Sequence, residues 1–194
     1  IFVSNGILKD IMSMDFREFI ADVQKRNEIV ARKGTFDYRD FISYMPASPL
    51  KNYAFQRTGQ LMYKDRADVL GLGQPSFSNG SAYGDLDNDG WPDIYIGNDF
   101  HENDYLYIND KKGGFTEELT SRTAHSSQFS MGVDVADINN DAWPEIITAD
   151  MLPSDPYILR RSLGEDEYNT FQIKIKNGYN HQYARNTLQL NRGE

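Results

Sequence analysis

Short runs of apolar residues, separated by turn residues, dominate the middle of the chain. The clearest runs predict strands near residues 80–84, 94–98, 105–109 and 115–119. β-Branched and aromatic residues are frequent in these runs, while Asp, Asn and Gly are concentrated between them. We expect the four antiparallel strands to pair into one small sheet.

A helical spacing precedes this region. Apolar side chains recur at i, i+3, i+4 and i+7, in the residues Phe16, Phe19, Ile20 and Val23. Asp15 followed by Glu18 predicts a capping box at the start of this helix, and Gly34 predicts its end. A shorter helix is expected over residues 36–44, before Pro46. We interpret the apolar stripe as a face that packs locally.

A second helical region follows residue 150. Ser154, Asp155 and Pro156 have the pattern of a helix start with proline in the first turn. Gly164 predicts a break, and a second helix is expected over residues 165–176. Both helical regions therefore interrupt a chain that otherwise has the pattern of short strands.

Acidic side chains alternate in the loop between the first two predicted strands. Positions 1, 3, 5 and 9 of this loop are acidic, and Gly90 at position 6 permits the positive φ of a sharp turn. Carboxylates with this spacing can converge on one hard cation, and the carbonyl at position 7 can add an oxygen. We therefore predict a Ca²⁺ site formed by Asp85, Asp87, Asp89, Trp91 and Asp93.

The loop does not fit an EF-hand. An EF-hand loop lies between helices and closes on a glutamate at position 12, where this chain has Ile96. The residues 94–96 are β-branched or aromatic, so the loop leads into a strand. The remaining alternative is a solvated polar turn without an ion.

The same loop recurs 52 positions later. The recurrence predicts a second, weaker Ca²⁺ site formed by Asp137, Asn139, Asp141, Trp143 and Glu145. We expect lower affinity because Asn139 removes one charge and Ala142 stands where the first loop has its glycine. Ser130, Gly132 and Ile146 match Ser78, Gly80 and Ile94 at the same offset. A period near 50 residues with several strands per unit is typical of propeller blades.

The repeat divides the chain into three units. Residues 1–74 form the first unit with a helical insertion at 7–50, residues 75–126 form the compact second unit, and residues 127–194 form the third with an insertion at 151–185. The predicted third strand of each unit begins near Asn52, Asp104 and Asn186. Residues 1–6 resemble a second strand, so we expect an internal fragment of a longer chain. The expected fold is all-β, a partial β-propeller with two helical insertions.

Composition narrows the choice of partner. The 194 residues carry a net charge of −9, which disfavours nucleic acid and anionic membranes, although seven acidic side chains belong to the two loops. Cysteine is absent, so disulfides play no part. No apolar run approaches the roughly 18 residues that a membrane helix needs.

The motifs resemble the FG-GAP or VCBS repeat family, whose integrin-α-like propellers hold calcium in loops of the form D-x-[DN]-x-D-G-x-x-D. Residues 85–93 match this form fully. Longer stretches, such as FSMGVDVADINND and KNGYNHQYARNTLQLNRG, look like secreted VCBS-repeat proteins of Bacteroidetes that often carry an ASPIC/UnbV domain. The resemblance implies a calcium-stabilised propeller outside the cytoplasm, either secreted or attached to the outer membrane as a lipoprotein.

The favoured function is binding or scaffolding at the cell surface, with a protein or glycan ligand and other outer-membrane proteins as partners. The alternative is a calcium-dependent carbohydrate-active enzyme, a lyase or hydrolase, on a propeller scaffold. We predict no catalytic residue, because His101, His125 and His181 are scattered and form no metal-ligand spacing. A third reading is an adhesion component that docks through its aromatic-rich insertions.

Overall fold

The fold is described from a computed structural model, which divides into two compact units. One unit contains residues 7–49, and the other contains residues 1–6 and 50–194. The residues whose structure is described are 1–6, 13–34, 41, 44–99, 102–160, 166 and 168–193, and the side chains of residues 32 and 33 lie outside the description. Among the described residues, no helix is both long and apolar enough to cross a bilayer.

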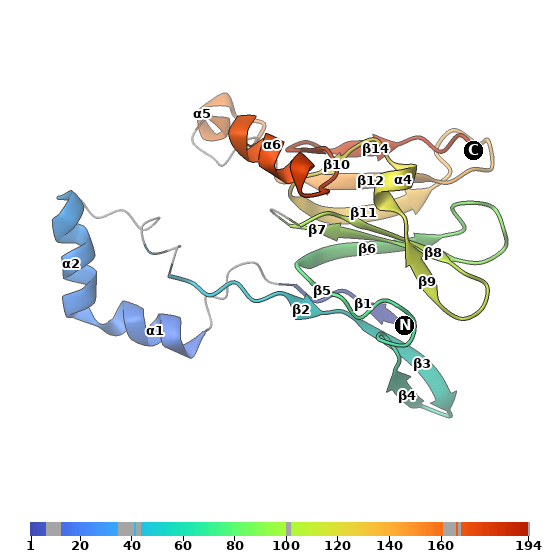
Figure 1. Ribbon diagram of the computed structural model, residues 1–194, viewed down its shortest axis with the longest axis horizontal. Helices are drawn as coiled ribbons and strands as arrows, with labels where there is room; N and C mark the ends of the chain where they lie inside the picture. The colour runs from blue at the N-terminus through green and yellow to red at the C-terminus, as the bar shows by residue number, and fades with distance from the viewer. Residues whose placement is uncertain are drawn as a thin grey trace. The chain divides into compact units, whose positions relative to one another are not determined.

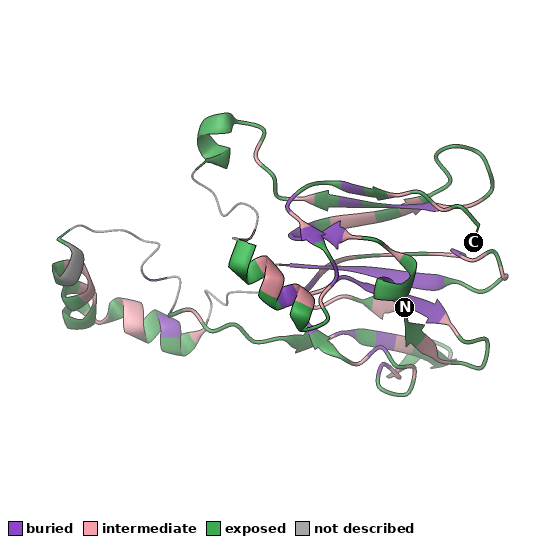
Figure 2. Ribbon diagram, turned by 45° about the horizontal axis from the view of Figure 1, so that its top comes forward, coloured by how far each residue is buried: buried purple, intermediate pink, exposed green. Residues whose placement is uncertain are grey.

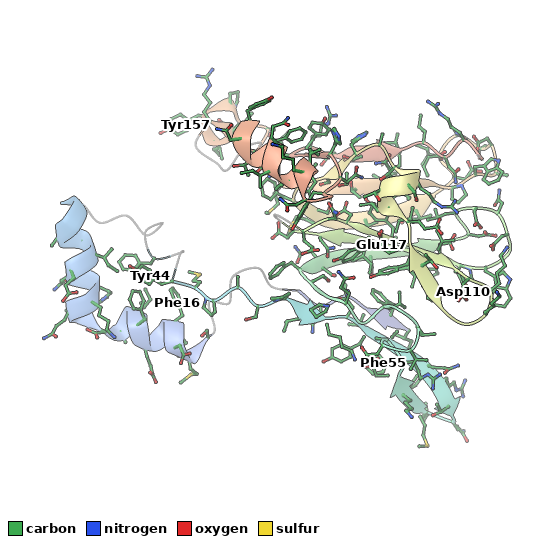
Figure 3. All side chains as sticks on the ribbon, viewed as in Figure 1. Phe16, Tyr44, Phe55, Asp110, Glu117 and Tyr157 are labelled. Atoms are coloured by element: carbon green, nitrogen blue, oxygen red, sulfur yellow. The ribbon has the colours of Figure 1, made fainter. Side chains whose placement is uncertain are left out.

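The predicted four-stranded sheet is confirmed. It consists of β6 (Ser78–Gly84), β7 (Asp93–Asn98), β8 (Tyr105–Asn109) and β9 (Phe115–Glu117), paired antiparallel in chain order. The last strand is shorter than expected, because α4 (Leu119–Arg122) starts at Leu119. Glu117 ends the strand: its Oε1 accepts hydrogen bonds from the amides of Leu106 and Leu119, at 3.2 and 2.8 Å (Figure 3).

Two related sheets flank this one, and Figure 1 shows the three sheets side by side in chain order. The first sheet contains β1 (Phe2–Val3), β3 (Tyr53–Gly59) and β4 (Met62–Asp65). The third contains β11 (Ser130–Ala136), β12 (Glu145–Asp150) and β14 (Thr187–Gln189). Two short pairs complete the strands: β2 (Leu50–Lys51) with β5 (Pro75–Ser76), and β10 (Ser126–Ser127) with β13 (Gln182–Tyr183).

The strand registers confirm the repeat inferred from the sequence. Tyr95 pairs with Leu106 in the second sheet, and the equivalent pairs are Phe2 with Ala54 in the first sheet and Ile147 with Leu188 in the third. The irregularity near the start of β6, between Ser78 and Gly80, recurs in β11 between Ser130 and Gly132. Three sheets with identical registers are one structural unit repeated.

The sheets are joined by two apolar cores and by a recurring polar contact. One face of the second sheet packs on the first sheet through Ile94, Ile96, Tyr105 and Tyr107. Its other face, with Tyr95, Leu106 and Ile108, packs on Ile146 of the third sheet. Of the described strands, β7 and β8 of the second sheet are the most continuously buried (Figure 2).

The polar contact repeats the same geometry in each sheet. The side chains of Asn52, Asp104 and Asn186 accept a hydrogen bond from the amides of Asn5, Asn98 and Asp150, respectively, at 2.8 to 2.9 Å. Asn52 also donates to the Ser78 hydroxyl of the next sheet, and Asp104 accepts from the equivalent Ser130 hydroxyl. This polar contact therefore links each sheet to its neighbour.

The helical region of the smaller unit differs from the prediction. The expected single helix is two, α1 (Met14–Ala21) and α2 (Val23–Lys33), because the Asp22 side chain accepts hydrogen bonds from the amides of Gln24 and Lys25 and starts a new helix. The predicted capping box is wrong: Ser13 is the N-cap residue, and Asp15 lies in the first turn.

The end of this region is as predicted, because Gly34 is the left-handed C-cap of α2. Val23, which was assigned to the apolar stripe, is 55% exposed. The local aromatic packing is formed by Phe16, Phe19, Phe41 and Tyr44, and the ring of Phe19 stacks on that of Tyr44 at 4.5 Å (Figure 3). Most of the helix expected over 36–44 lies outside the described residues.

Both helices of the second insertion are present. α5 (Pro156–Leu159) begins after Asp155, whose side chain accepts from the amides of Tyr157 and Ile158. α6 (Tyr168–Lys176) ends before Asn177, as expected. The expected break at Gly164 lies outside the described residues.

Candidate metal centre

The first acidic loop connects β6 to β7 and is held by its own carboxylates. Asp85 accepts hydrogen bonds from the amides of Asp89 and Gly90 at 2.9 and 2.8 Å. Asp89 accepts from the amide of Trp91 at 2.8 Å. Asn88 and Gly90 have φ values of 54° and 87°, as the tight turn requires. The turn brings alternate side chains to one side of the loop.

Three of the predicted ligands meet there. Carboxylate oxygens of Asp85, Asp87 and Asp89 all lie within 4.8 Å of one another. Oδ1 of Asp87 is buried and has no hydrogen-bond partner among the described residues. A buried carboxylate oxygen without a donor is costly unless a cation binds it. This donor set of clustered carboxylate oxygens fits a hard divalent cation.

Two basic side chains lie beside the cluster. Lys111, in the β8–β9 turn that Asp110 marks in Figure 3, has its Nζ 2.7 Å from Oδ2 of Asp89. Arg122 of α4 has a guanidinium nitrogen 4.0 Å from Oδ2 of Asp87. Lys111 lowers the pKa of Asp89, whereas burial and then the neighbouring Asp89 raise the pKa of Asp87. The cluster thus carries negative charge that these two cations only partly balance.

Asp93 lies outside that cluster and performs a bracing role. Its side chain is fully buried, and its two oxygens accept hydrogen bonds from the amides of Leu86 and Asn109, both at 2.9 Å. Burial raises the pKa of Asp93. Asp93 therefore attaches the loop to β8, and its direct contact with a cation stays a prediction, as does that of the Trp91 carbonyl.

The second loop, between β11 and β12, repeats this backbone. Asp137 accepts from the amides of Asp141 and Ala142, and Glu145 accepts from the amide of Ile138. Ala142 has a φ of 72°, so alanine occupies the left-handed conformation of the glycine in the first loop. The predicted residues Asp137, Asn139, Asp141 and Glu145 therefore come together as the repeat requires.

The second loop differs inside the turn. Nδ2 of Asn139 donates to Oδ2 of Asp141 at 2.9 Å and to Oε1 of Glu145 at 3.3 Å. An amide group thus supplies donors where the first loop has a carboxylate with an unpaired oxygen. In the part of the chain that the structure describes, only the first loop gathers three acidic side chains in metal-binding geometry.

The two loops contact each other. Nδ2 of Asn88 in the first loop donates to the carbonyl of Ala142 in the second at 3.0 Å. Nδ2 of Asn191 donates to the carbonyls of Leu86 and Pro144, at 2.7 and 3.2 Å, and so bridges both loops. Sequence reasoning missed both residues. Asn191 lies outside the nine-residue motif, and Asn88 stands at position 4, to which the motif assigns no role. Asn109 is the equivalent of Asn191 in the second sheet, and it donates to the carbonyl of Pro92. The recurrence of asparagine at this position of the repeat could have identified Asn191.

A cleft of about 880 Å³ opens beside the first loop, between the second and third sheets. Asp87 and Arg122 line it together with Ala124. At the 52-residue offset, Arg122 and Ala124 correspond to Leu70 and Leu72, which pack against the core between the first and second sheets. The small Ala124 and the polar Arg122 do not fill this space as the two leucines do, and Asp87 lines the cleft that remains.

The histidines do not form a catalytic arrangement in the described region. His125 and His181 lie near the aromatic rings of Tyr183 and Phe171, and His101 lies outside the described residues. Burial, followed by Arg185 and His181, lowers the pKa of His125. No carboxylate among the described residues hydrogen-bonds to either imidazole, as a general acid–base pair would require.

Comparison with protein-family models identifies a match in the segment that holds both acidic loops. The family model of the FG-GAP-like repeat matches residues 85–148, which begin at the first residue of the first loop and end within β12. No curated protein matches the chain. The match therefore covers both acidic loops, and it supports the repeat that the strand registers show.

Proposed function

We propose that this protein is a calcium-binding β-propeller module that binds or scaffolds other molecules outside the cytoplasm. The observation that carries the proposal is the buried, unpartnered Oδ1 of Asp87 inside the Asp85, Asp87 and Asp89 cluster. The cluster lies in the segment that matches the FG-GAP-like repeat. Calcium is the preferred ion because it binds six to eight oxygen ligands in flexible geometry.

The bound ion acts as a structural brace. It neutralises three carboxylates in a loop that already contacts the second loop through Asn88. Asp93 attaches the same loop to β8. Calcium therefore stiffens the end of two neighbouring sheets and, through them, the blade-to-blade packing.

The chemistry of the site supports the proposed extracytoplasmic placement. An exposed loop with three clustered carboxylates resembles the extracellular class of calcium sites, whose dissociation constants are on the order of 10⁻⁴ to 10⁻³ M. Cytosolic free calcium is too low to fill such a site. Secretion, or attachment to the outer membrane as a lipoprotein, provides the calcium that the loop needs.

The ligand is a protein or glycan at the cell surface, bound by the insertions. The insertions supply aromatic residues beyond those that the sheets bury, such as Tyr157 and Tyr168, which are 66% and 76% exposed. Aromatic side chains are the usual anchors of binding surfaces. Tyr157 projects from α5 in Figure 3.

A calcium titration of the melting temperature tests the proposal. We expect Tm to rise with calcium in the wild type and the rise to disappear in Asp87→Asn. Without calcium, Asp87→Asn should leave Tm unchanged or raise it, because it removes a charge whose pKa is raised by burial and by Asp89.

The matched control is Asp134→Asn, which makes the same charge change in β11, away from the cluster, and should keep the calcium response. A wild-type Tm that ignores calcium would overturn the proposal. So would an Asp87→Asn variant that retains the full response.

A further inference from the structure

The charge of one stretch is opposite to that of the rest of the chain. From Tyr168 to Gly193 there is no Asp or Glu, while Lys174, Lys176, Arg185 and Arg192 are cationic. The whole protein carries a net charge of −9. This stretch includes α6 and β13, so the positive charge is concentrated on one part of the larger unit.

Within this stretch, basic and aromatic side chains form one cluster. The Tyr183 ring is its centre: the Arg185 guanidinium lies 4.8 Å from the ring centroid, and His125 lies 5.9 Å away. The ring of Phe171, from α6, lies 6.4 Å from Tyr183 and 5.6 Å from His181. We name these residues the basic aromatic cluster: His125, Phe171, His181, Tyr183 and Arg185.

Burial alternates along residues 181–185, and this places the side chains of the cluster on the exposed side of the segment. Gln182 and Ala184 are buried, whereas His181 and Arg185 are exposed and Tyr183 is half-buried. Residues at alternate positions of an extended segment share one face. The amide of Arg185 also donates to the carbonyl of Tyr183 at 2.8 Å, and the guanidinium of Arg185 lies over the Tyr183 ring.

An ion pair and hydrogen bonds connect α6 and β13, the two elements that carry Phe171 and Tyr183. Lys174 of α6 is 7% exposed and forms an ion pair with Asp166 at 2.5 Å. Its Nζ also donates to Oε1 of Gln182 at 3.3 Å, and Nε2 of Gln182 donates to the carbonyl of Glu102. These bonds attach α6 to β13, so the helix and the strand hold Phe171 and Tyr183 in a fixed relation.

Among the described residues, the basic groups of the cluster have no acidic counterpart. In the described part of the chain, Arg185 forms no ion pair and the imidazole of His181 has no hydrogen-bond partner. A guanidinium held against an aromatic ring and left without a carboxylate is suited to bidentate binding of an external one.

We propose that the basic aromatic cluster binds a carboxylate-bearing sugar, such as a uronate residue of an acidic glycan. Arg185 binds the sugar carboxylate, His181 donates a further hydrogen bond, and the rings of Phe171 and Tyr183 contact the apolar face of the sugar. The inference rests on the proposed binding function, because it names the class of ligand that the second insertion would bind. A glycan fits better than an acidic peptide because the charged groups surround aromatic rings, on which the C–H groups of a sugar ring can pack.

Calorimetric titration of the full chain in calcium tests this. The probe is a glucuronate-containing oligosaccharide, compared with its carboxyl-reduced neutral form and with a tetraglutamate peptide. We expect binding of the acidic oligosaccharide, and Arg185→Gln should weaken it by about tenfold, the usual effect of losing one charge-assisted pair. His181→Gln should weaken it less.

The matched control is Arg192→Gln, which removes the same charge from the same acid-free stretch but outside the cluster, and should change affinity by less than about twofold. Equal affinity for the neutral sugar, an equal loss in Arg192→Gln, or absent binding would overturn the inference. Tighter binding of tetraglutamate that depends on Arg185 would also overturn it, in favour of an acidic protein partner. If the wild type does not bind the sugar but its Tm still rises with calcium, this inference is overturned and the proposed calcium site is not.

Discussion

Asp104 places an ionisable side chain in the buried polar contact between the second and third sheets. It is fully buried and accepts hydrogen bonds from the amide of Asn98, the Tyr95 hydroxyl and the Ser130 hydroxyl. Burial raises its pKa from 3.8 to about 7 in spite of these donors. The equivalent residues of the other sheets are the uncharged Asn52 and Asn186, which avoid that cost.

We expect Asp104→Asn to stabilise the protein in a pH-dependent way. The native state holds the proton more tightly than the unfolded chain, so the free energy of unfolding falls as pH rises from about 4 to about 7. The variant should gain on the order of 2 kcal/mol at pH 8 and nothing at pH 4. The amide nitrogen of the variant replaces Oδ2, so the Tyr95 and Ser130 hydroxyls, which now donate to Asp104, would accept hydrogen bonds from it, as the Ser78 hydroxyl accepts from Asn52 at 2.9 Å. Urea denaturation at both pH values measures this, and a loss of stability at pH 8 would contradict it.

At the scale of the element, the two acidic loops share one backbone conformation but differ in the hydrogen bonds of their side chains. Both loops use amide donors to the aspartate at position 1, and both bond the residue after it to the acid at position 9. In the first loop an oxygen of Asp87 stays unpaired, whereas in the second Asn139 satisfies Asp141 and Glu145. The second loop is therefore closed by its own hydrogen bonds.

Asn139→Asp should raise the calcium affinity of the second loop, which we predict to be the weaker site. The change replaces the amide donor with a third carboxylate beside Asp137 and Asp141, so without calcium we expect a lower Tm from charge repulsion. With calcium, the second binding event in calorimetric titration should become tighter, and Tm should recover. Asn140→Asp, in the same loop at a position that the motif does not use, is the control. An unchanged calcium affinity of the second loop would refute the prediction.

At the scale of the molecule, the stacking of the sheets leaves a repeated face uncovered. Leu86, Tyr95, Leu106 and Ile108 of the second sheet are buried in its contact with the third. The equivalent residues of the third sheet are Ile138, Ile147, Leu188 and Leu190, which are 47%, 37%, 45% and 58% exposed. The third sheet thus presents the apolar face that the second sheet buries, which is typical of a surface that another sheet covers.

We therefore expect the 194-residue chain by itself to self-associate through this face. Leu188→Glu should reduce association, measured by sedimentation velocity across a concentration series, and should change Tm little because the side chain is already exposed. Leu61→Glu, in the β3–β4 turn with 86% exposure, is the control and should leave association unchanged. A monodisperse monomeric wild type would show that the exposed face does not drive association.

Local patterns determined most of the elements. Short apolar runs between turn residues placed the four strands of the second sheet. The central strands β7 and β8 are buried on both faces, so they take apolar residues at successive positions. The spacing of Asp85, Asp87 and Asp89 predicted their convergence, because a tight turn brings alternate residues together. The 52-residue offset predicted the equivalent sheet, because the registers repeat wherever the sequence repeats.

Contacts between distant residues were decided only by the tertiary structure. The bond from Asn191 to Leu86, the approach of Lys111 to Asp89, and the gathering of His125 with Tyr183 join positions whose separation follows no fixed spacing. The split at Asp22 was decided by competition between a continuous helix and a side chain able to cap a new one. The sequence alone thus determined the repeat and the acidic loops, because local spacing encodes them. The packing of the sheets decided that Asp87 has an unpaired carboxylate oxygen and that the outer face of the third sheet is exposed. Burial depends on which distant segments pack against a residue, and local spacing does not encode this.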